Sequence, residues 1–401
     1  MRALRPWLAN VALVVVSLLA GLILIEMFLR LLGWSYPVFA RPDPDLGWSF
    51  RPGVSGWSVH ENTAYVRINR FGFRGEDWSE QPATDTLRVA VLGDSYADSS
   101  NLSEEKSLTG QIQAHLSECP SLGTRRVEVL NFGVSGYGTG QHYLQLQHRV
   151  AAFHPSMVLL AFYAGNDVPD NIRPLSVLTE KPYFTLLPSG GLRYDGSFRD
   201  SDAFRAEVRS DWQRRLVNAS YLLQAVKQAY LGKPIMPSPL KSQIFKATGA
   251  DPTPAPQNPP LFEPPFDDTW RAAWNITEKL LVLMHDWAQA HGMEFRLTII
   301  PDPIEGLPGE AIRRATVAKN HLADLDYPVT RVADFAARNG IATLSLLEPL
   351  RAFADREHQF TYGFYAAKPG DGHLNAFGNE VAGRAIATWL CAAAAKGIRP
   401  N

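Results

Sequence analysis

The feature that most constrains the fold is a repeated alternation between short apolar runs and longer amphipathic segments, from about residue 87 onward. The apolar runs are continuous, so both faces of each strand should be buried, as in a parallel sheet covered by helices. This pattern predicts an α/β, doubly wound parallel sheet with helices on both faces. The expected strands are Leu87–Leu92, Val127–Leu130, Met157–Phe162, Phe295–Ile300 and Ile341–Leu347.

The amphipathic segments between these runs predict the covering helices. In the last of them, Phe377, Val381, Ala385 and Trp389 recur at four-residue spacing, which predicts that this side of the helix faces the core. The expected helices are Leu108–Ser117, Gln141–Phe153, Trp270–Ala290, Val329–Asn339 and Phe377–Ala395.

The N-terminus predicts a membrane anchor over residues 1–33. Arg2 and Arg5 precede an apolar stretch, Trp7–Ile25, and about 20 apolar residues suffice to cross a bilayer as a helix. Basic residues ahead of the span favour a cytoplasmic N-terminus, which places the remaining chain in the periplasm, outside the inner membrane. A cleaved signal peptide is the alternative, although no convincing small-residue cleavage site is present. A buried core helix fits poorly at an N-terminus with basic flanks.

Composition argues against nucleic acid as a partner and does not decide whether the two cysteines are paired. The formal net charge is -1 and no Lys- or Arg-rich block occurs, so nucleic acid is not an expected partner. Cys119 should end the helix after the first strand, and Cys391 lies in the last helix. These helices can be neighbours in a doubly wound sheet, so the cysteines are either two separate thiols or one disulfide formed in an oxidising compartment.

Two further segments flank or interrupt the sheet. Residues 34–86 form a β-rich extension, in which Ala64–Asn69 alternates as a hairpin or edge strand would. Asn69–Gly75 is interpreted as a structural turn packed on the main sheet, with a binding element as the alternative. Residues 173–268 form an insertion with one expected helix, Phe204–Tyr230, and a Pro-rich run, Lys233–Pro265. This insertion is either a lid over a site or a surface excursion.

Four short blocks bring chemically useful residues to the carboxyl edge of the predicted sheet. The first strand ends in Gly-Asp-Ser, with the serine at position 95, where open α/β folds place their sites. Small residues 131–138 follow the second strand, and Asn166 follows the third. His373 stands just before the last helix. A neutral imidazole can take the proton of a serine, and backbone or amide N–H groups can stabilise an oxyanion.

Metal chemistry is the rival use of histidine, and the sequence does not favour it. His142, His148 and His154 are six residues apart and so do not share one helix face, and no HExxH motif occurs. No metal and no cofactor are expected.

The four blocks resemble those of the SGNH hydrolases, also called GDSL-like esterases. The resemblance covers most of the chain from about residue 87 to 396, without the insertion. The N-terminal helix, the NRFGFRG segment and the ending DGHLNAFGN are similar to the bacterial envelope branch of that superfamily. The resemblance implies a flavodoxin-like, SGNH-type domain over residues 87–401.

The resemblance also implies a role for each site residue. Ser95 is the expected nucleophile, and its backbone N–H joins an oxyanion hole completed by Gly136 and the Asn166 side chain. His373 is the expected general base and then acid, oriented by Asp371.

Two departures from the family pattern affect these assignments. Tyr96 replaces the leucine of the GDSL name, and this change is interpreted as harmless. Asp371 and His373 are separated by one residue instead of the usual two, which weakens the assignment of Asp371. Gly133 is an alternative to Gly136 as the oxyanion donor.

The expected function is a serine esterase that removes acyl groups, acetyl above all, from an envelope or exported glycan, or from another small ester. An O-acyltransferase that acetylates an exported polysaccharide with the same triad is the alternative. A non-catalytic glycan-binding protein ranks last, because none of the blocks is eroded. If His373 must be neutral, activity should fall as the pH drops through its pKa, ordinarily near 6.5. The sequence indicates no oligomeric state.

Overall fold

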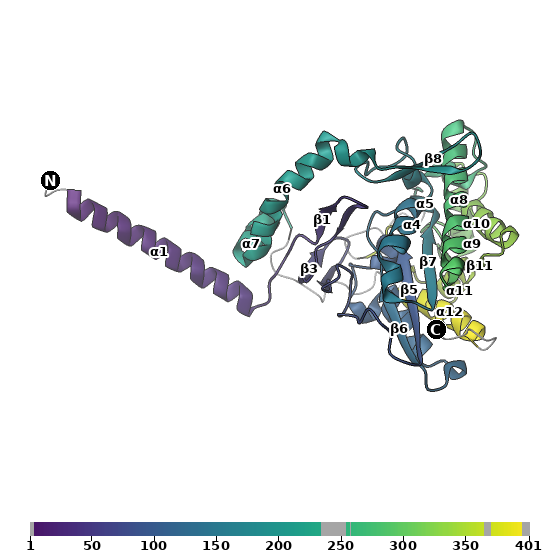
Figure 1. Ribbon diagram of the computed structural model, residues 1–401, viewed down its shortest axis with the longest axis horizontal. Coiled ribbons are helices and arrows are strands. Elements are labelled where there is room, and N and C mark those ends of the chain that lie inside the picture. Colours follow the sequence, from purple (N-terminus) through teal and green to yellow (C-terminus); the bar gives the residue numbers. More distant parts are fainter. Residues whose placement is uncertain (1–3, 234–253, 257, 365–369, 395–401) are drawn as a thin grey trace.

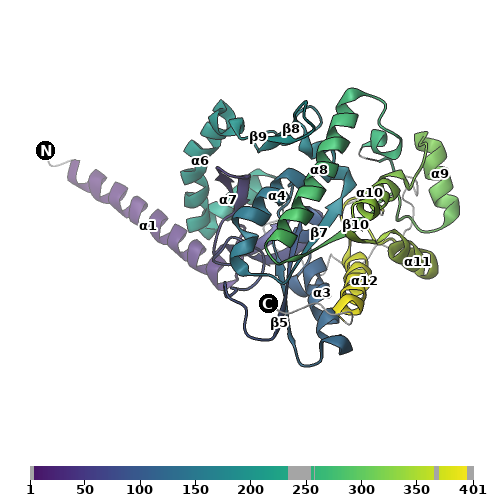
Figure 2. The same cartoon turned by 45° about the vertical axis from the view of Figure 1, so that its right-hand side comes forward.

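The computed structural model describes residues 4–233, 254–256, 258–364 and 370–394. Its main sheet has five parallel strands, and the predicted doubly wound fold is confirmed (Figures 1 and 2). The spatial order corresponds to 2-1-3-4-5 along the chain, which is the flavodoxin-like order. From one edge to the other the strands are β6 (Arg126–Asn131), β5 (Thr86–Gly93), β7 (Met157–Tyr163), β10 (Glu294–Ile300) and β11 (Ala342–Ser345).

Helices cover both faces of this sheet. Every residue of β5 and β7 is buried, which explains why these strands show continuous rather than alternating apolar sequence. One face packs against α3 (Leu108–Ser117) and α12 (Ala376–Ala394). The other face packs against α4 (Thr139–His148), α8 (Asp268–Ala290) and α10 (Tyr327–Arg338). The five expected helices are therefore present.

Further short elements complete the α/β domain, and two of its longer helices were not predicted. These two are α9 (Glu310–Asn320) and α11 (Leu347–Glu357). Single turns follow β5 and β7, as α2 (Ser95–Asp98) and α5 (Ala164–Asp167). The 3₁₀ turns are η1 (Glu104–Lys106), η2 (Pro120–Leu122), η3 (Val150–Phe153), η4 (Pro169–Asn171), η5 (Ser197–Asp200) and η7 (Pro259–Phe262).

The apolar stripe predicted for the last helix is displaced from its buried face. The buried residues of α12 include Ala382, Ile386 and Leu390, each one position after a predicted one. Trp389 lies at the margin of the core, where the Arg296 guanidinium covers its ring at 4.7 Å from the centroid. The predicted stripe therefore borders the buried face: Val381, Ala385 and Trp389 are partly buried against the same core. Gly383, where a Cβ would lie 2.4 Å from the Gln111 Cβ, lets α12 pack closely on α3.

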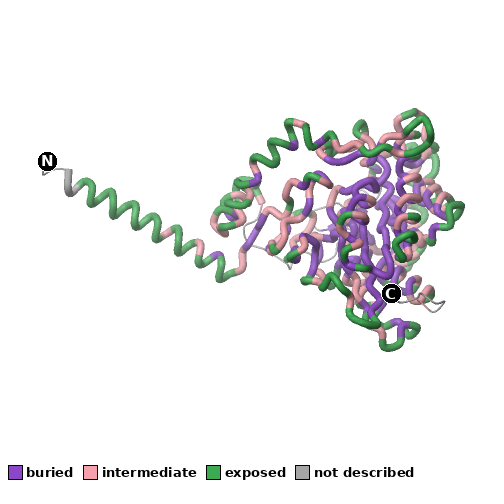
Figure 3. The backbone as a smooth tube through the Cα atoms, in the orientation of Figure 1, coloured by how far each residue is buried: buried purple, intermediate pink, exposed green. Residues whose placement is uncertain are grey.

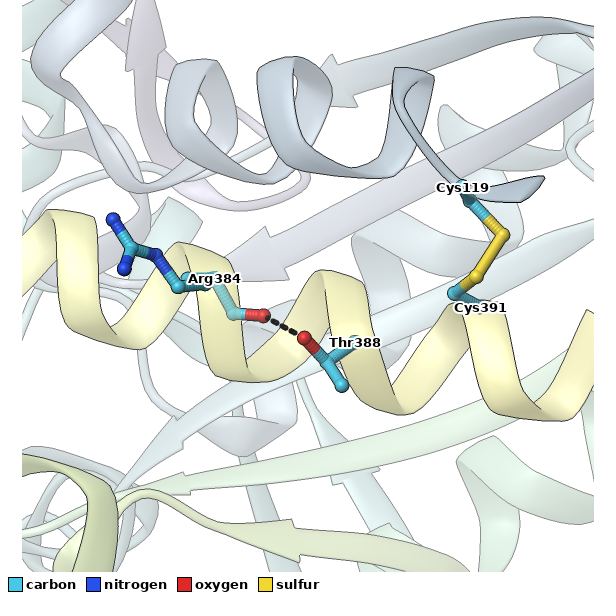
Figure 4. The surroundings of a disulfide bond; sticks show 4 residues. All are labelled: Cys119, Arg384, Thr388 and Cys391. Carbon is cyan, nitrogen blue, oxygen red and sulfur yellow. Dashed lines mark hydrogen bonds between the residues drawn. A yellow bond between two sulfur atoms is a disulfide. The ribbon is translucent and has the colours of Figure 1, made fainter.

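Cys119 and Cys391 form a disulfide that joins the end of α3 to α12, with Cα atoms 5.6 Å apart (Figure 4). The reading of two separate thiols is therefore wrong. The bond links positions 272 residues apart, and cross-links over long loops restrict the unfolded chain, typically stabilising the fold by about 2–4 kcal/mol.

The N-terminal extension forms two hairpins. They are β1 (Ala40–Asp43) with β2 (Gly47–Phe50), and β3 (Ser55–Val59) with β4 (Thr63–Arg67). The turn after them packs on the α/β domain as predicted, because Phe73 joins the aromatic cluster of Phe132 and Phe153. Buried Arg74 donates from this turn to the carbonyls of Asp98 and Leu102.

The N-terminal helix α1 (Leu4–Leu31) projects away from the body of the molecule (Figures 1 and 3). Its stretch Trp7–Leu31 has a mean hydropathy of 2.7, and an 18-residue apolar window within it is 0% buried, so the helix is long and apolar enough to cross a membrane. The alternative of a buried core helix is wrong.

The insertion contains more regular structure than expected. A hairpin of β8 (Tyr183–Leu186) and β9 (Leu192–Asp195) precedes two helices, α6 (Asp202–Ala219) and α7 (Tyr221–Tyr230). The single predicted helix is broken at Ser220, whose hydroxyl accepts from the Leu223 N–H and so caps α7. Most of the Pro-rich run lies outside the described residues.

Candidate active site

Ser95, Gly136, Asn166 and His373 meet around one cavity at the carboxyl edge of the sheet. Ser95 begins α2 directly after β5, Gly136 follows β6, and Asn166 lies in α5 after β7. The cavity has a volume of about 330 Å³. Its lining comprises Ser58, His60, Glu61, Ser95, Tyr96, Ser100, Asn101, Ser135, Gly136, Tyr163, Asn166, Gly372 and His373.

Tight packing at the end of β5 fixes the position of Ser95. A Cβ at Gly93 would lie 2.9 Å from the Ala161 carbonyl oxygen and 2.8 Å from the Ala97 side chain, so only glycine fits there. Asp94 caps α2 by accepting a 2.9 Å hydrogen bond from the Tyr96 N–H. The serine is thereby held on the first turn of α2, facing the cavity.

His373 is placed to act as the base for Ser95. Its Nε2 lies 2.7 Å from the Ser95 Oγ, within hydrogen-bonding distance. A neutral imidazole in this position can accept the hydroxyl proton as the oxygen attacks a carbonyl carbon.

The carboxylate beside His373 is Glu61, and the prediction that Asp371 orients the imidazole is wrong. Glu61 Oε1 lies 2.9 Å from His373 Nδ1, and Oε2 accepts a 3.2 Å hydrogen bond from the His373 backbone N–H. The Asp371 carboxylate instead accepts from the Gly372 N–H at 2.8 Å. Glu61 lies in the turn between β3 and β4, so the N-terminal extension contributes directly to the site.

The unusual one-residue spacing before His373 has a structural explanation. Gly372 has a φ of +78°, and a Cβ there would lie 2.5 Å from Glu61 Oε1. The residue before His373 must therefore be glycine to leave room for the carboxylate that reaches in from the hairpin. Asn62 fixes the hairpin turn to the α/β domain, because its side-chain amide donates to the Asn101 carbonyl at 2.8 Å.

The pKa values of the two groups shift in opposite directions because they stabilise each other's charged forms. Burial alone would lower the pKa of His373, but the contact with Glu61 and the charges of Asp94 and Asp98 raise it above the ordinary value. Burial alone would raise the pKa of Glu61, but its contacts with His373 lower it. Glu61 is thus an anion that favours the imidazolium form of His373.

The two glycine candidates for the oxyanion hole, Gly133 and Gly136, differ in their surroundings. The Gly133 N–H donates to Asn131 Oδ1 at 2.9 Å, and a Cβ there would lie 2.3 Å from the Asp98 backbone nitrogen. The Gly133 N–H therefore already has a partner, and the absence of a Cβ there serves close packing. Gly136, in contrast, lines the cavity.

Asn166 is oriented by a buried carboxyl group. Its Nδ2 donates a 2.7 Å hydrogen bond to Asp94 Oδ2, and the second N–H of the same amide remains as a donor. Burial raises the pKa of Asp94 to about 6, although its hydrogen bonds with Tyr96 and Asn166 lower it. Asp94 therefore positions the serine turn and the Asn166 amide together.

Tyr96, the departure from the family motif that was interpreted as harmless, lies in the site. Its ring is buried, lies 5.0 Å from the His373 ring between centroids, and its hydroxyl donates to the Gly372 carbonyl at 3.2 Å. It holds the loop that carries His373. The departure from the family motif is the one sequence signal that pointed to this position.

A second cavity, of about 510 Å³, adjoins the first between the N-terminal hairpins and α7. Both cavities are lined by Ser58, His60, Ser100 and Ser135. The aromatic residues of the second cavity include Trp48, Phe50 and Trp57. The site therefore continues into a larger, partly apolar space.

No metal centre is apparent in the part of the chain that the structure describes. Within it, no three or more His, Cys, Asp or Glu side chains gather as metal ligands would.

Comparison with known proteins gives structural likenesses at low identity. No family model and no curated protein matches the chain. Among solved structures it is similar to the acetyl xylan esterase AlAXEase, with 13% identity, a TM-score of 0.36, and coverage of 76% of this chain and 98% of that one. A catalytic mutant of an acetylxylan esterase from Geobacillus stearothermophilus gives 11% identity, a TM-score of 0.36, and coverage of 75% and 92%.

A GDSL-like lipase from Bacteroides thetaiotaomicron is a further similar structure. It gives 12% identity, a TM-score of 0.32, and coverage of 79% of this chain and 91% of that one. At such identities the function of this chain has to be inferred from the residues of its own site.

Proposed function

We propose that the protein is a serine esterase acting through Ser95, His373 and Glu61. The observation that carries the proposal is the continuous series of contacts from Ser95 Oγ to His373 Nε2 and from His373 Nδ1 to Glu61, at 2.7 and 2.9 Å. A nucleophile within reach of a base, which is in turn held by a carboxylate, is the arrangement that acyl transfer requires.

The reaction follows from this arrangement. Ser95 Oγ attacks the ester carbonyl carbon while His373 takes its proton, and Glu61 stabilises the imidazolium. The oxyanion is held by the Ser95 and Gly136 backbone N–H groups and by the free N–H of Asn166. The imidazolium gives its proton to the departing alcohol oxygen, leaving an acyl-serine. Water, deprotonated by His373, then attacks this ester; the imidazolium returns the proton to Ser95 Oγ as the acyl C–O bond breaks, and the acid is released.

The substrate class we propose is an acetylated carbohydrate outside the cytoplasm. Aromatic walls beside a polar catalytic cavity suit sugar rings, which combine apolar faces with hydroxyl groups. The disulfide suits an oxidising compartment, and α1 suits an anchor in the bacterial inner membrane with the catalytic domain in the periplasm. In this proposal residues 1–33 anchor the chain, 34–86 supply Glu61, and 87–401 supply the remaining site.

O-acetyl transfer to an exported polysaccharide is the second candidate, and the adjoining cavity favours it. A sugar hydroxyl bound there would reach the same acyl-serine in place of water, since Ser58 and Ser135 border both spaces. The two functions share every step up to the acyl-serine. A glycan-binding protein without activity would have no need of the intact contacts around His373.

The test is to incubate the protein in detergent or vesicles with acetylated xylan and with p-nitrophenyl acetate. We expect acetate release from both, and release from the polymer should exceed release from a parallel sample of heat-unfolded protein. Unacetylated oligosaccharide is then added with p-nitrophenyl acetate, and the products are weighed by mass spectrometry. Acetylated sugar would identify a transferase, free acetate alone an esterase, and neither product from a folded protein would contradict the proposal.

The pH dependence of activity should reflect the raised pKa of His373. The imidazole must be neutral to accept the serine proton, so activity is lost as the pH falls through this pKa. Because Glu61 raises the pKa above its ordinary value, we expect the acid limb to lie above pH 6.5. The measurement is kcat/KM for p-nitrophenyl acetate from pH 5 to 9, and an acid limb below the ordinary value would contradict the Glu61–His373 contact.

A further inference from the structure

The inserted helices α6 and α7 lie on the side of the body from which α1 emerges (Figure 1). α7 packs directly against α1. The link is polar and specific: Glu26 of α1 accepts hydrogen bonds from the Ser220 hydroxyl and from the Tyr221 and Leu222 N–H groups. A carboxylate at the first turn of α7 is favourable for the helix dipole. The end of the apolar helix is thus fixed to the start of α7.

A second contact fixes the same junction. Arg30, one turn after Glu26, pairs with it at 2.6 Å and donates to the Ala219 carbonyl at 2.8 Å. Its guanidinium also covers the Tyr221 ring, 4.8 Å from the centroid. The position of α7 relative to α1 is therefore determined by several bonds and not by the intervening chain.

Both helices carry large apolar side chains that are exposed. On α6, Val208, Trp212 and Leu216 recur every four residues and are 51%, 62% and 54% exposed. Phe204 and Asp211 of α6 are buried, and Phe204 continues the same four-residue spacing at the N-terminal end of the row. A row of large apolar side chains that is exposed over most of its length needs a second apolar environment.

α7 repeats this arrangement. Gln224 and Ala225 are buried against the body, whereas Leu223, Val226 and Tyr230 point the other way. Tyr230 is 88% exposed and Val226 57%. We call the six exposed residues the α6–α7 apolar face; they are Val208, Trp212, Leu216, Leu223, Val226 and Tyr230.

We propose that the α6–α7 apolar face lies in the interface of the phospholipid bilayer that α1 crosses. The face lies on the helix pair that adjoins α1 through the Glu26 junction, and so on the side of the molecule next to a membrane crossed by α1. Trp and Tyr are the residues that favour the headgroup region. Arg209, exposed beside the row on α6 and without a carboxylate partner among the described residues, can bind lipid phosphate.

Docking of this kind has a consequence for the site. Lys227, Gln228 and Leu231, at or just beyond the end of α7, line the cavity that adjoins the catalytic one. The helix pair would therefore hold this cavity close to the headgroups, where an ester carried by the same membrane is reached more readily than a dissolved one. This inference rests on the proposed anchoring by α1, but not on the chemistry proposed for Ser95.

The test uses the full-length chain reconstituted in phosphatidylcholine–phosphatidylglycerol vesicles. Both native cysteines are in the disulfide, so one introduced cysteine is the only thiol available for a polarity-sensitive fluorophore. Leu216→Cys probes the face, Leu18→Cys probes α1, and Thr330→Cys is the aqueous control, on exposed positions of α6, α1 and α10. Quenching is measured with doxyl-labelled lipid and with aqueous iodide.

We expect the label at position 216 to be quenched by doxyl lipid and protected from iodide several-fold relative to position 330. A label at 216 as accessible to iodide as the one at 330, while position 18 is quenched by lipid, would overturn docking and leave anchoring intact. Energy transfer between labels at 216 without lipid quenching would also overturn it, since a second copy would then cover the face.

Discussion

Ser95→Ala is expected to lower kcat/KM for p-nitrophenyl acetate by roughly 10³- to 10⁶-fold, because no other group can form the acyl intermediate. His373 Nε2 lies 2.7 Å from the Ser95 Oγ, so removing the hydroxyl leaves the base without its nucleophile. Any residual rate would come from the oxyanion donors and from water. The measurement is steady-state hydrolysis by wild type and variant at equal concentration.

A matched control separates loss of chemistry from loss of structure. Ser58→Ala removes a hydroxyl from the same cavity but from a residue of β3. We expect this variant to stay within a few-fold of wild type. Phosphonate inhibitors should add a covalent mass to wild type and to Ser58→Ala only. Equal activity of wild type and Ser95→Ala would show that another residue performs the hydrolysis observed.

The sheet was predictable because each of its strands is a local feature of the sequence. Runs such as Met157–Phe162 are apolar without interruption, and their burial on both faces requires covering helices. Three blocks follow successive strands, so Ser95, Gly136 and Asn166 had to meet at one edge of the sheet. His373 was predictable from its place before the last helix together with the family motif.

Glu61 was not predictable, because its role depends on a contact across 312 positions of the sequence. Nothing in the sequence around Glu61 distinguishes a hairpin turn that contributes to an active site from a purely structural one. Asp371 was preferred because it is near His373 in sequence, whereas the backbone there directs its carboxylate to the Gly372 N–H. Proximity along the chain is a poor guide when a neighbouring hairpin can supply the same group.

A pair of variants can decide which carboxylate, Glu61 or Asp371, orients His373. Glu61→Gln keeps the size of the side chain but removes the charge that stabilises the imidazolium, so we expect kcat/KM to fall roughly 10²- to 10⁴-fold. Asp371→Asn should change it by less than about three-fold, because the Asp371 carboxylate accepts from the Gly372 N–H and the Asn amide oxygen can do the same. Steady-state hydrolysis of p-nitrophenyl acetate by the two purified variants gives this comparison.

The pH profile distinguishes an electrostatic role of Glu61 from a purely structural one. Contact with Glu61 is what raises the pKa of His373 against the opposing effect of burial. In Glu61→Gln the burial remains while the charge is lost, so the pKa falls and the acid limb should move to lower pH. Misplacement of the loop alone would reduce activity at every pH without moving the limb. An unshifted limb in Glu61→Gln, with a shifted limb in Asp371→Asn, would return the orienting role to Asp371.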